Sequence, residues 1–308
     1  MPLIQPPLMV TGGTHPARAL RMMIRDLSRG SQGVTEGGDL KVRSTTPGAA
    51  VRVGPGSAVV AGAAWGQGSY TQANAGDTVV PIAPTGAQPR TDLLVLRVED
   101  PEFEGTRDPA KDDVGYFHVL TDQSATVAAP PPGMTAIPLA RISLPANCAT
   151  VTDAVITDLR RLTNPRRSRV VQMINGFPYS EFPQQAGVWQ DNWPPGGVVS
   201  LDVPKWAVRG NIITTVAGLR VWGETLIGFR NKLGGIIGGE FQVDTDTITV
   251  YSKINVVCAD TPWFSVEMRG TSVPLRLQGG RYNQAKGGCD VSQSTALIFD
   301  VEYVEETY

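Results

Sequence analysis

The distribution of apolar and polar positions predicts a chain built mainly from short β-strands. Apolar and polar residues alternate in residues 40–43 and 50–53, and glycine or proline bounds each stretch. Residues 92–99 contain four consecutive apolar positions, which indicates a strand that is buried on both faces. Residues 114–120 follow a charged loop and are expected to pair with that strand antiparallel. The first half of the chain is therefore predicted to be rich in β-sheet.

One helix is expected, over residues 16–28. Pro16 suits a first helical turn because its missing N–H is not needed there, and Gly30 provides a stop. Four apolar side chains recur at helical spacing and form one face: Leu20, Met23, Ile24 and Leu27. Three arginines lie mostly away from that face: Arg18, Arg21 and Arg25. We expect the helix to cover a sheet edge or to pack on a partner subunit, in preference to contacting a membrane.

The second half of the chain differs from the first in its tryptophan content and in its pattern of short apolar runs. Residues 163–169 are polar, contain proline and are locally basic, which is typical of a linker. Five of the six tryptophans follow them, together with eight or nine short strand candidates, the number and spacing of a β-sandwich or jelly roll. The predicted fold is all-β with one short N-terminal helix. Its parts are an extended arm or frayed terminus over 1–13, a β domain over 14–162, the linker and a sandwich-like domain over 170–308.

The composition of the chain excludes several classes of partner and site. The formal net charge is −2 and no basic stripe is present, so nucleic acid is not an expected partner. The three cysteines are widely spaced without a Cys-x-x-Cys pair, which disfavours a zinc site or a disulfide framework and suits free thiols in a reducing cytoplasm. The sequence shows neither a signal peptide pattern nor an apolar run of about 20 residues. Export by a recognisable signal and membrane insertion are not expected.

Catalytic motifs are scarce, and the prediction is that the protein is not an enzyme and uses no cofactor. His15 lies at the expected helix start and His118 lies inside an apolar strand, and no Gly-x-Ser-x-Gly elbow accompanies them. The glycine-rich residues 234–239 lack the strand-to-helix context of a dinucleotide site and indicate a tight crossing or a turn.

Two acidic positions invite a comparison with glycosidases and calcium sites. Asp244 and Asp246 are spaced so that both carboxylates lie on one face of a strand or turn. The ligand pattern of an EF-hand is absent, so a solvated turn is the favoured interpretation and no metal site is predicted. Whether this pair binds a metal stays open at this point.

The best candidates for ligand binding lie in a polar loop of the second half. Asp191 stands between Trp189 and Trp193, and a carboxylate beside broad aromatic faces suits sugar recognition, since a sugar ring stacks its C–H face on an aromatic ring. Tyr179 joins them as a fourth candidate. The alternative is that the tryptophans fill the core. The prediction is a glycan-binding site formed by these four residues, with no catalytic residue assigned.

Five segments of the first half carry a resemblance to a known family. They are residues 33–42, 51–60, 89–98, 138–142 and 156–160. In their order and spacing they resemble the N-terminal domain of minor tail and baseplate proteins of tailed bacteriophages, especially those that infect actinobacteria.

The resemblance implies a virion protein of the tail tip or baseplate. Residues 14–162 would attach it to other tail proteins, usually as a homotrimer, and residues 170–308 would form a head that binds a host cell-surface saccharide. Since no coiled-coil or collagen-like shaft separates the halves, a compact protein fits better than a long fibre. Two alternatives are a structural baseplate subunit that docks another tail protein and, less favoured, a glycan-cleaving tail enzyme.

Overall fold

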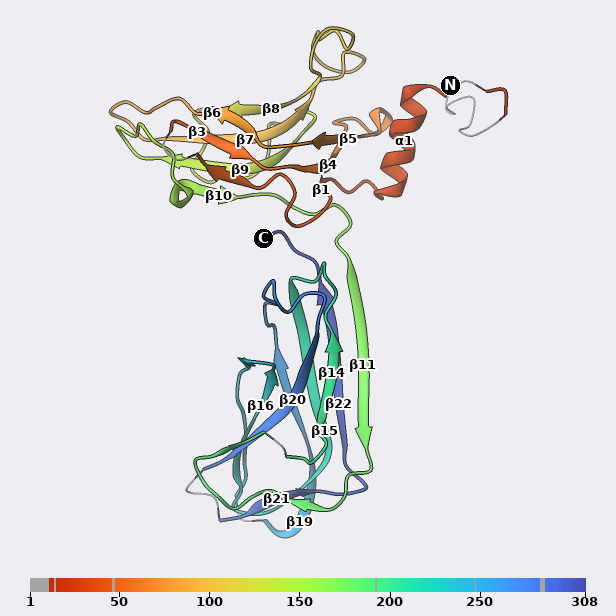
Figure 1. The fold of residues 1–308 in the computed structure, drawn as a ribbon, viewed down its shortest axis with the longest axis vertical. Helices are drawn as coiled ribbons and strands as arrows, with labels where there is room; N and C mark the ends of the chain where they lie inside the picture. The colour runs from red at the N-terminus through yellow and green to blue at the C-terminus, as the bar shows by residue number, and fades with distance from the viewer. Residues whose placement is uncertain (1–10, 14, 46–47, 192, 247, 283–285) are drawn as a thin grey trace. The chain divides into compact units, whose positions relative to one another are not determined.

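A computed structural model describes residues 11–13, 15–45, 48–191, 193–246, 248–282 and 286–308. Most of the expected N-terminal arm therefore lies outside the described residues. Apart from one α-helix and two short 3-10 helices, the regular elements described are strands, and every strand pair within the sheets is antiparallel (Figure 1). The prediction of an all-β fold with one short helix is confirmed. The chain forms two compact units, Met1–Pro165 with Thr307–Tyr308, and Arg166–Glu306.

The described residues of the first unit form three sheets. One has the strand order β1 (Gly33–Val34), β4 (Gly56–Ala61) and β5 (Ser69–Asn74). Another has the order β2 (Val42–Ser44), β3 (Ala50–Val53) and β6 (Thr78–Pro81). The third has the order β10 (Ile156–Asp158), β9 (Ala136–Leu144), β7 (Arg90–Val98) and β8 (Gly115–Leu120). Two 3-10 helices, η1 (Trp65–Gln67) and η2 (Asp153–Val155), complete the unit.

Strand β7 is buried on both faces, as its apolar run predicts. Leu94 and Leu96 belong to the main core of the unit, whereas Leu93 and Val95 belong to a second, smaller cluster. The two clusters follow from the alternation of side chains along a strand. Strand β8 pairs with β7 as expected, with His118 opposite Val95.

Helix α1 (Ala17–Leu27) lies beside β5 and η1, and it presents its arginine side to them. Arg18 Nε donates to the carbonyl of Gly66 at 2.8 Å, and Arg21 Nε donates to that of Gln67 at 2.9 Å. Within its apolar face, Leu20 is 42 % and Leu27 is 73 % exposed, whereas Met23 and Ile24 are half-buried. The helix therefore covers the edge strand β5, as expected, but with its arginine side, and packing on a partner subunit stays a prediction.

In the part of the second unit that the structure describes, the strands form a sandwich of two sheets. In one, β11 (Arg167–Asn175), β22 (Ala296–Val304), β15 (Arg209–Gly223), β21 (Gly288–Val291) and β12 (Ser180–Glu181) follow one another, and β19 (Ile248–Asp260) also pairs with β15. In the other, β13 (Trp189–Gln190), β20 (Ser272–Arg281), β16 (Leu226–Leu233) and β17 (Ile236–Ile237) follow one another, with β14 (Val198–Asp202) on β20 and β18 (Phe241–Asp244) on β16. A single apolar core includes residues of both sheets.

Strand register defines the two ends of this sandwich. Arg167 and Arg209 both pair with Val304, so the chain enters and leaves the unit at one end. Strand β11 ends at Asn175, opposite Ala296, but β15 continues to Gly223. The last residues of β15 therefore lie at the opposite end, which we call the far end, next to β19 and β21 (Figure 1).

Candidate functional site

The structure does not bring the four predicted binding residues together. Trp193 is only 4 % exposed and belongs to the core of the second unit. Its ring contacts Phe182 edge-on, with centroids 4.8 Å apart, and lies 6.2 Å from the ring of Phe229. The expectation that Trp193 is exposed on a polar loop is wrong. Polar neighbours in sequence surround it, but the indole fills the sandwich because burial of a large aromatic ring is strongly favourable.

Trp189 lies on the outer face of the sheet that contains β20, and Arg230 covers its ring. It pairs with Gly280 in β20, where a Cβ would come within 2.9 Å of the indole, so only glycine leaves room for the ring. The guanidinium carbon of Arg230 lies 3.7 Å from the Trp189 ring centroid. Stacking of a ligand on this ring would require Arg230 to move.

Asp191 lies in the same polar network. Lys232 Nζ contacts its two carboxylate oxygens at 2.9 and 3.0 Å, and Gln278 Nε2 donates to it as well. The Lys232 hydrogen bond, opposed by partial burial, lowers the pKa of this carboxyl below its usual value. Arg230 Nε donates to Gln278 Oε1 at 2.8 Å, which joins Asp191 to the Trp189 pair. The carboxylate is thus an ionised member of a surface network.

A cleft of about 320 Å³ adjoins Trp189. Beside Trp189 and Arg230 its wall includes Glu240 and Tyr282, whose hydroxyl donates to the Glu240 carboxylate. That hydrogen bond raises the pKa of Tyr282. The cleft offers charged and hydroxyl groups, and the Trp189 ring beside it is covered by Arg230.

Tyr179 lies at the far end of the sandwich and belongs to a different group of residues. The tip cluster consists of Tyr179, Arg220, Trp222 and Tyr251. Arg220 has its guanidinium carbon 5.7 Å from the Tyr179 ring centroid and 4.5 Å from that of Tyr251. Trp222 packs edge-on against Tyr251 with ring centroids 5.4 Å apart. Tyr179 and Tyr251 remain 62 % and 59 % exposed, so this cluster presents aromatic surface to solvent.

A buried carboxylate fixes the arginine of the tip cluster. Arg220 Nε donates to both oxygens of Asp290 at 2.8 and 3.0 Å, and Asp290 is fully buried. This pairing raises the pKa of Arg220. Because a bidentate arginine–carboxylate pair has a defined geometry, the two tyrosine rings flank a guanidinium with little freedom to move.

Sequence reasoning missed Arg220, Trp222 and Tyr251, although Arg220 and Trp222 left a signal. Arg220 and Trp222 are two residues apart in a strand and so project from the same face. Tyr251 carried no comparable signal, because its place next to them depends on the pairing of β19 with β15, which brings Ser252 opposite Val221.

The remaining sequence candidates show no catalytic arrangement. The ring of His118 packs edge-on against Tyr116 at 5.9 Å, and burial lowers the pKa of the imidazole. Among the described residues, no group of three or more histidine, cysteine, aspartate or glutamate side chains could hold a metal ion. Residues 234–239 form a hairpin in which Leu233 pairs with Ile236, so the predicted turn is confirmed.

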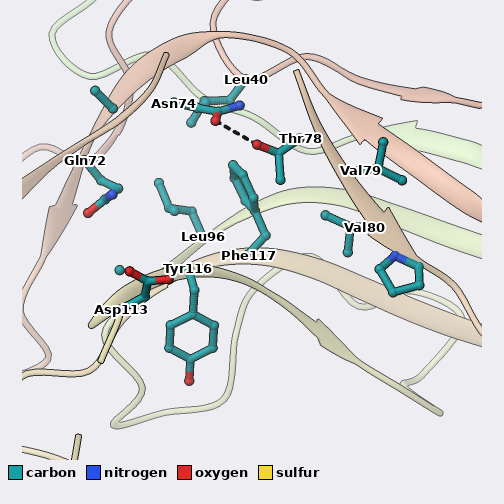
Figure 2. A pocket seen from close by; sticks show the side chains of 13 residues that line it. Leu40, Gln72, Asn74, Thr78, Val79, Val80, Leu96, Asp113, Tyr116 and Phe117 are labelled. Atoms are coloured by element: carbon teal, nitrogen blue, oxygen red, sulfur yellow. Dashed lines mark hydrogen bonds between the residues drawn. The ribbon is translucent and has the colours of Figure 1, made fainter. Parts of the chain in front are cut away.

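A cavity of about 420 Å³ lies in the first unit, lined by parts of β5, β6 and β8 (Figure 2). Each of these strands is the last of its sheet. Leu96 and Phe117 form an apolar part of the cavity wall. In a polar part of the wall, Thr78 Oγ1 donates to Asn74 Oδ1 at 2.8 Å. The last strand of a sheet is a common site of protein assembly. No helix among the described residues is long and apolar enough to cross a membrane.

Comparison with known proteins finds no family model and no curated protein that matches this chain. A solved structure of infectious bursal disease virus, Gx strain, is similar at 9 % identity and a TM-score of 0.30, covering 89 % of this chain and 70 % of that chain. The VP2 subviral particle of the same virus is similar at 8 % identity and 0.28, covering 90 % and 70 %. The insecticidal delta-endotoxin Cry8Ea1 from Bacillus thuringiensis is similar at 8 % identity and 0.21, covering 89 % and 51 %. Similarities this low carry no argument about function.

Proposed function

We propose that this protein is a non-enzymatic virion component of a bacteriophage tail tip or baseplate. Its first unit attaches to other tail proteins, and its second unit binds a saccharide of the host cell surface through the tip cluster. The assignment to a tail rests on the five segments between residues 33 and 160 that resemble tail proteins. The assignment of the ligand rests on the chemistry of the cluster.

The observation that carries the ligand assignment is the placement of Arg220 between two exposed tyrosines. Tyr179 and Tyr251 offer ring faces on which the C–H face of a sugar can stack. The guanidinium between them has donors for ring hydroxyl oxygens. Asp290 holds it in place before a ligand arrives, so little side-chain entropy is lost on binding.

The tip cluster also has a suitable position. It lies at the far end of the second unit, opposite the end at which the chain enters from the first unit. A binding surface at the far end stays accessible when other protein covers the entry end. In a homotrimer three such surfaces act together, and avidity raises the weak affinity expected of a single shallow site.

Sedimentation with purified bacterial cell walls tests the ligand. We expect the full chain to sediment with the walls and Tyr251→Ala to remain largely in solution. The matched control is Trp263→Ala, which removes an aromatic residue of similar exposure, 57 % against 59 %, next to the entry end. Light scattering tests the trimer, which requires a mass three times the 32.9 kDa of one chain. Equal sedimentation of all three proteins would contradict the ligand assignment, and a monomeric mass would contradict the trimer.

A second candidate function is a structural subunit whose second unit docks another tail protein. It is favoured by an apolar band on the outer face of the sheet that contains β11. Four side chains of the band are 44–58 % exposed: Val171, Met173, Ile213 and Val257. The register places Val171 and Ile213 on either side of Asp300, and Met173 and Thr215 on either side of Ile298. Exposed apolar patches of this kind mark protein interaction sites.

Substitution of the band separates the two candidates. If the second unit docks a protein, Met173→Glu with Val257→Glu will prevent assembly into particles and leave cell-wall sedimentation unchanged. If it binds glycan alone, the same variant will assemble normally.

A further inference from the structure

The sequence contains a single asparagine that is followed directly by glycine, Asn175. Glycine has no Cβ to hinder the approach of its backbone nitrogen to the preceding side-chain amide, and it adopts the widest range of backbone angles. An Asn-Gly pair is therefore open to an intramolecular reaction that other asparagines undergo slowly. Whether the fold permits the reaction depends on the exposure and the hydrogen bonds of the two residues.

Both residues of the pair are exposed at the end of a strand. Asn175 is the last residue of β11, which is an end strand of its sheet. Gly176 has φ +69°, and beyond its chain neighbours no atom lies within 4 Å of the place that a Cβ would take. Among the described residues, neither the side-chain amide of Asn175 nor the Gly176 N–H has a hydrogen-bond partner. Strand ends open locally at little cost, which gives the backbone the freedom that a ring closure needs.

Two other exposed asparagines show how the fold can prevent the same reaction. The N–H that follows Asn147 belongs to Cys148 and donates to Thr85 Oγ1 at 2.8 Å, so the attacking nitrogen is engaged. Asn255 is held by its side chain, because its Oδ1 accepts from Gly218 N–H at 3.0 Å. Neither constraint is found at the Asn-Gly pair among the described residues.

We propose that Asn175 is a site of spontaneous deamidation in the folded protein. The backbone nitrogen of Gly176 loses its proton and attacks Cγ of the Asn175 side chain. A bond forms between that nitrogen and Cγ, the bond from Cγ to Nδ2 breaks, and ammonia leaves with the proton. Water then adds to either carbonyl carbon of the cyclic imide and opens the ring, which leaves aspartate or isoaspartate at this position. Water is the only co-reactant.

Isoaspartate adds a methylene to the backbone at a point with little slack. Ile174 packs against the core of the second unit and Phe177 is buried within it, so only the Asn-Gly pair lies between two anchored residues. Tyr179 of the tip cluster follows two residues after Phe177. The added atom therefore displaces Tyr179 from Arg220. This consequence for ligand binding rests on the proposed function, whereas the modification itself does not.

Peptide mapping by mass spectrometry after incubation of the full chain tests the site. The folded chain is kept at pH 6 and at pH 9, and a sample unfolded in guanidinium chloride is kept at pH 9. The peptides that contain Asn175, Asn147 and Asn255 are compared in each sample, so the two constrained asparagines serve as internal controls. Asn175→Gln is the matched variant, because it keeps the amide but would have to close a larger ring. Enzymatic methylation of isoaspartate identifies the product.

Cell-wall sedimentation tests the consequence for the tip cluster. The natural chain converted to isoaspartate should sediment with the walls at least tenfold less than the fresh chain, whereas Asn175→Asp, which carries the charge without the added backbone atom, should sediment normally. Equal sedimentation of the converted and fresh chains would refute the displacement of Tyr179. If the fresh chain itself does not sediment, the proposed function fails, and the mapping result is unaffected.

In the mapping experiment we expect the Asn175 peptide of the folded chain to convert at least tenfold faster than the Asn147 and Asn255 peptides. Conversion should be at least tenfold faster at pH 9 than at pH 6, because the attacking nitrogen must lose its proton, and Asn175→Gln should remove the methylation signal. The proposal is overturned if Asn175 converts no faster than the two controls, or if folding slows its conversion more than tenfold relative to the unfolded chain.

Discussion

The guanidinium carbon of Arg220 lies 4.5 Å from the ring centroid of Tyr251, although 31 positions separate the two residues in the sequence. The contact exists because β19 pairs with β15, and it turns an exposed tyrosine into part of a fixed surface. The arrangement requires a fully buried carboxylate, that of Asp290, which loses its hydration on folding. Arg220 is the side chain that pairs with it.

Arg220→Met is expected to destabilise the second unit by about 3 kcal/mol, because it leaves the buried carboxylate of Asp290 without its counter-charge. Asp290→Asn keeps a polar group there and should cost less. Chemical denaturation followed by tryptophan fluorescence measures both. A loss below about 1 kcal/mol for Arg220→Met would show that Asp290 is compensated by something other than this arginine.

The exposure of Leu20 and Leu27 in helix α1 predicts that Arg21 matters more for stability than these leucines. Arg21 contacts Asp100 at 3.2 Å and Glu102 at 2.6 Å, and its own side chain is only 12 % exposed. Arg21→Ala should therefore destabilise the first unit by about 1–3 kcal/mol. Leu27→Lys should change the free energy of unfolding by less than about 0.5 kcal/mol. The reverse order in thermal unfolding would mean that the apolar face is covered.

Acid should weaken the first unit through Asp158. Burial alone would raise the pKa of this carboxyl, but hydrogen bonds from Arg160 and the charge of that arginine lower it below the ordinary value of 3.8. A depressed folded-state pKa contributes stability that is complete above the unfolded value and is lost as the pH falls through the folded one. Asp158→Asn should thus be less stable at pH 7, and the difference from the natural protein should shrink below about pH 4. If the free energies of unfolding of the natural protein and of Asp158→Asn differ by the same amount at pH 7 and below pH 4, Asp158 does not contribute to acid sensitivity.

The three cysteines should differ in reactivity. Burial raises the pKa of the Cys258 thiol to about 12 and that of Cys289 well above its usual value, and both side chains are inaccessible. Cys148 is only partly buried. Titration of the native protein with a thiol reagent such as Ellman's reagent at pH 8 should modify one cysteine per chain within minutes, and the other two only after unfolding. Rapid modification of all three would contradict the buried positions.

The sequence was informative where burial depends on local pattern. The four apolar residues of β7 predicted a strand covered on both faces, and its partner β8 was predicted from the next apolar run. The orientation of α1 could not be predicted in the same way. Its amphipathic pattern defines two faces, but only contacts with residues 66 and 67 and with Asp100 decide that the arginine face is the inner one.

The candidate site shows a similar limit. A polar neighbourhood suggested that Trp193 is exposed, yet the ring lies in the core because Phe182 and Phe229 line the space it fills. Tyr179 was a candidate from the sequence, but its companions Arg220 and Tyr251 reach it through strand pairings between distant segments. Proximity in sequence was a poor guide to the site because the sandwich assembles each surface from several strands.

The central claim is that the tip cluster recognises a cell-surface saccharide, and the most direct test is binding of the full chain to an array of bacterial surface glycans. Three proteins are compared: the natural chain, Tyr179→Ala/Tyr251→Ala and the control Trp263→Ala. We expect the natural chain and the control to bind a defined set of glycans, and the double variant to lose at least tenfold in binding. Binding that is equal in all three proteins, or absent from the natural chain, would contradict it.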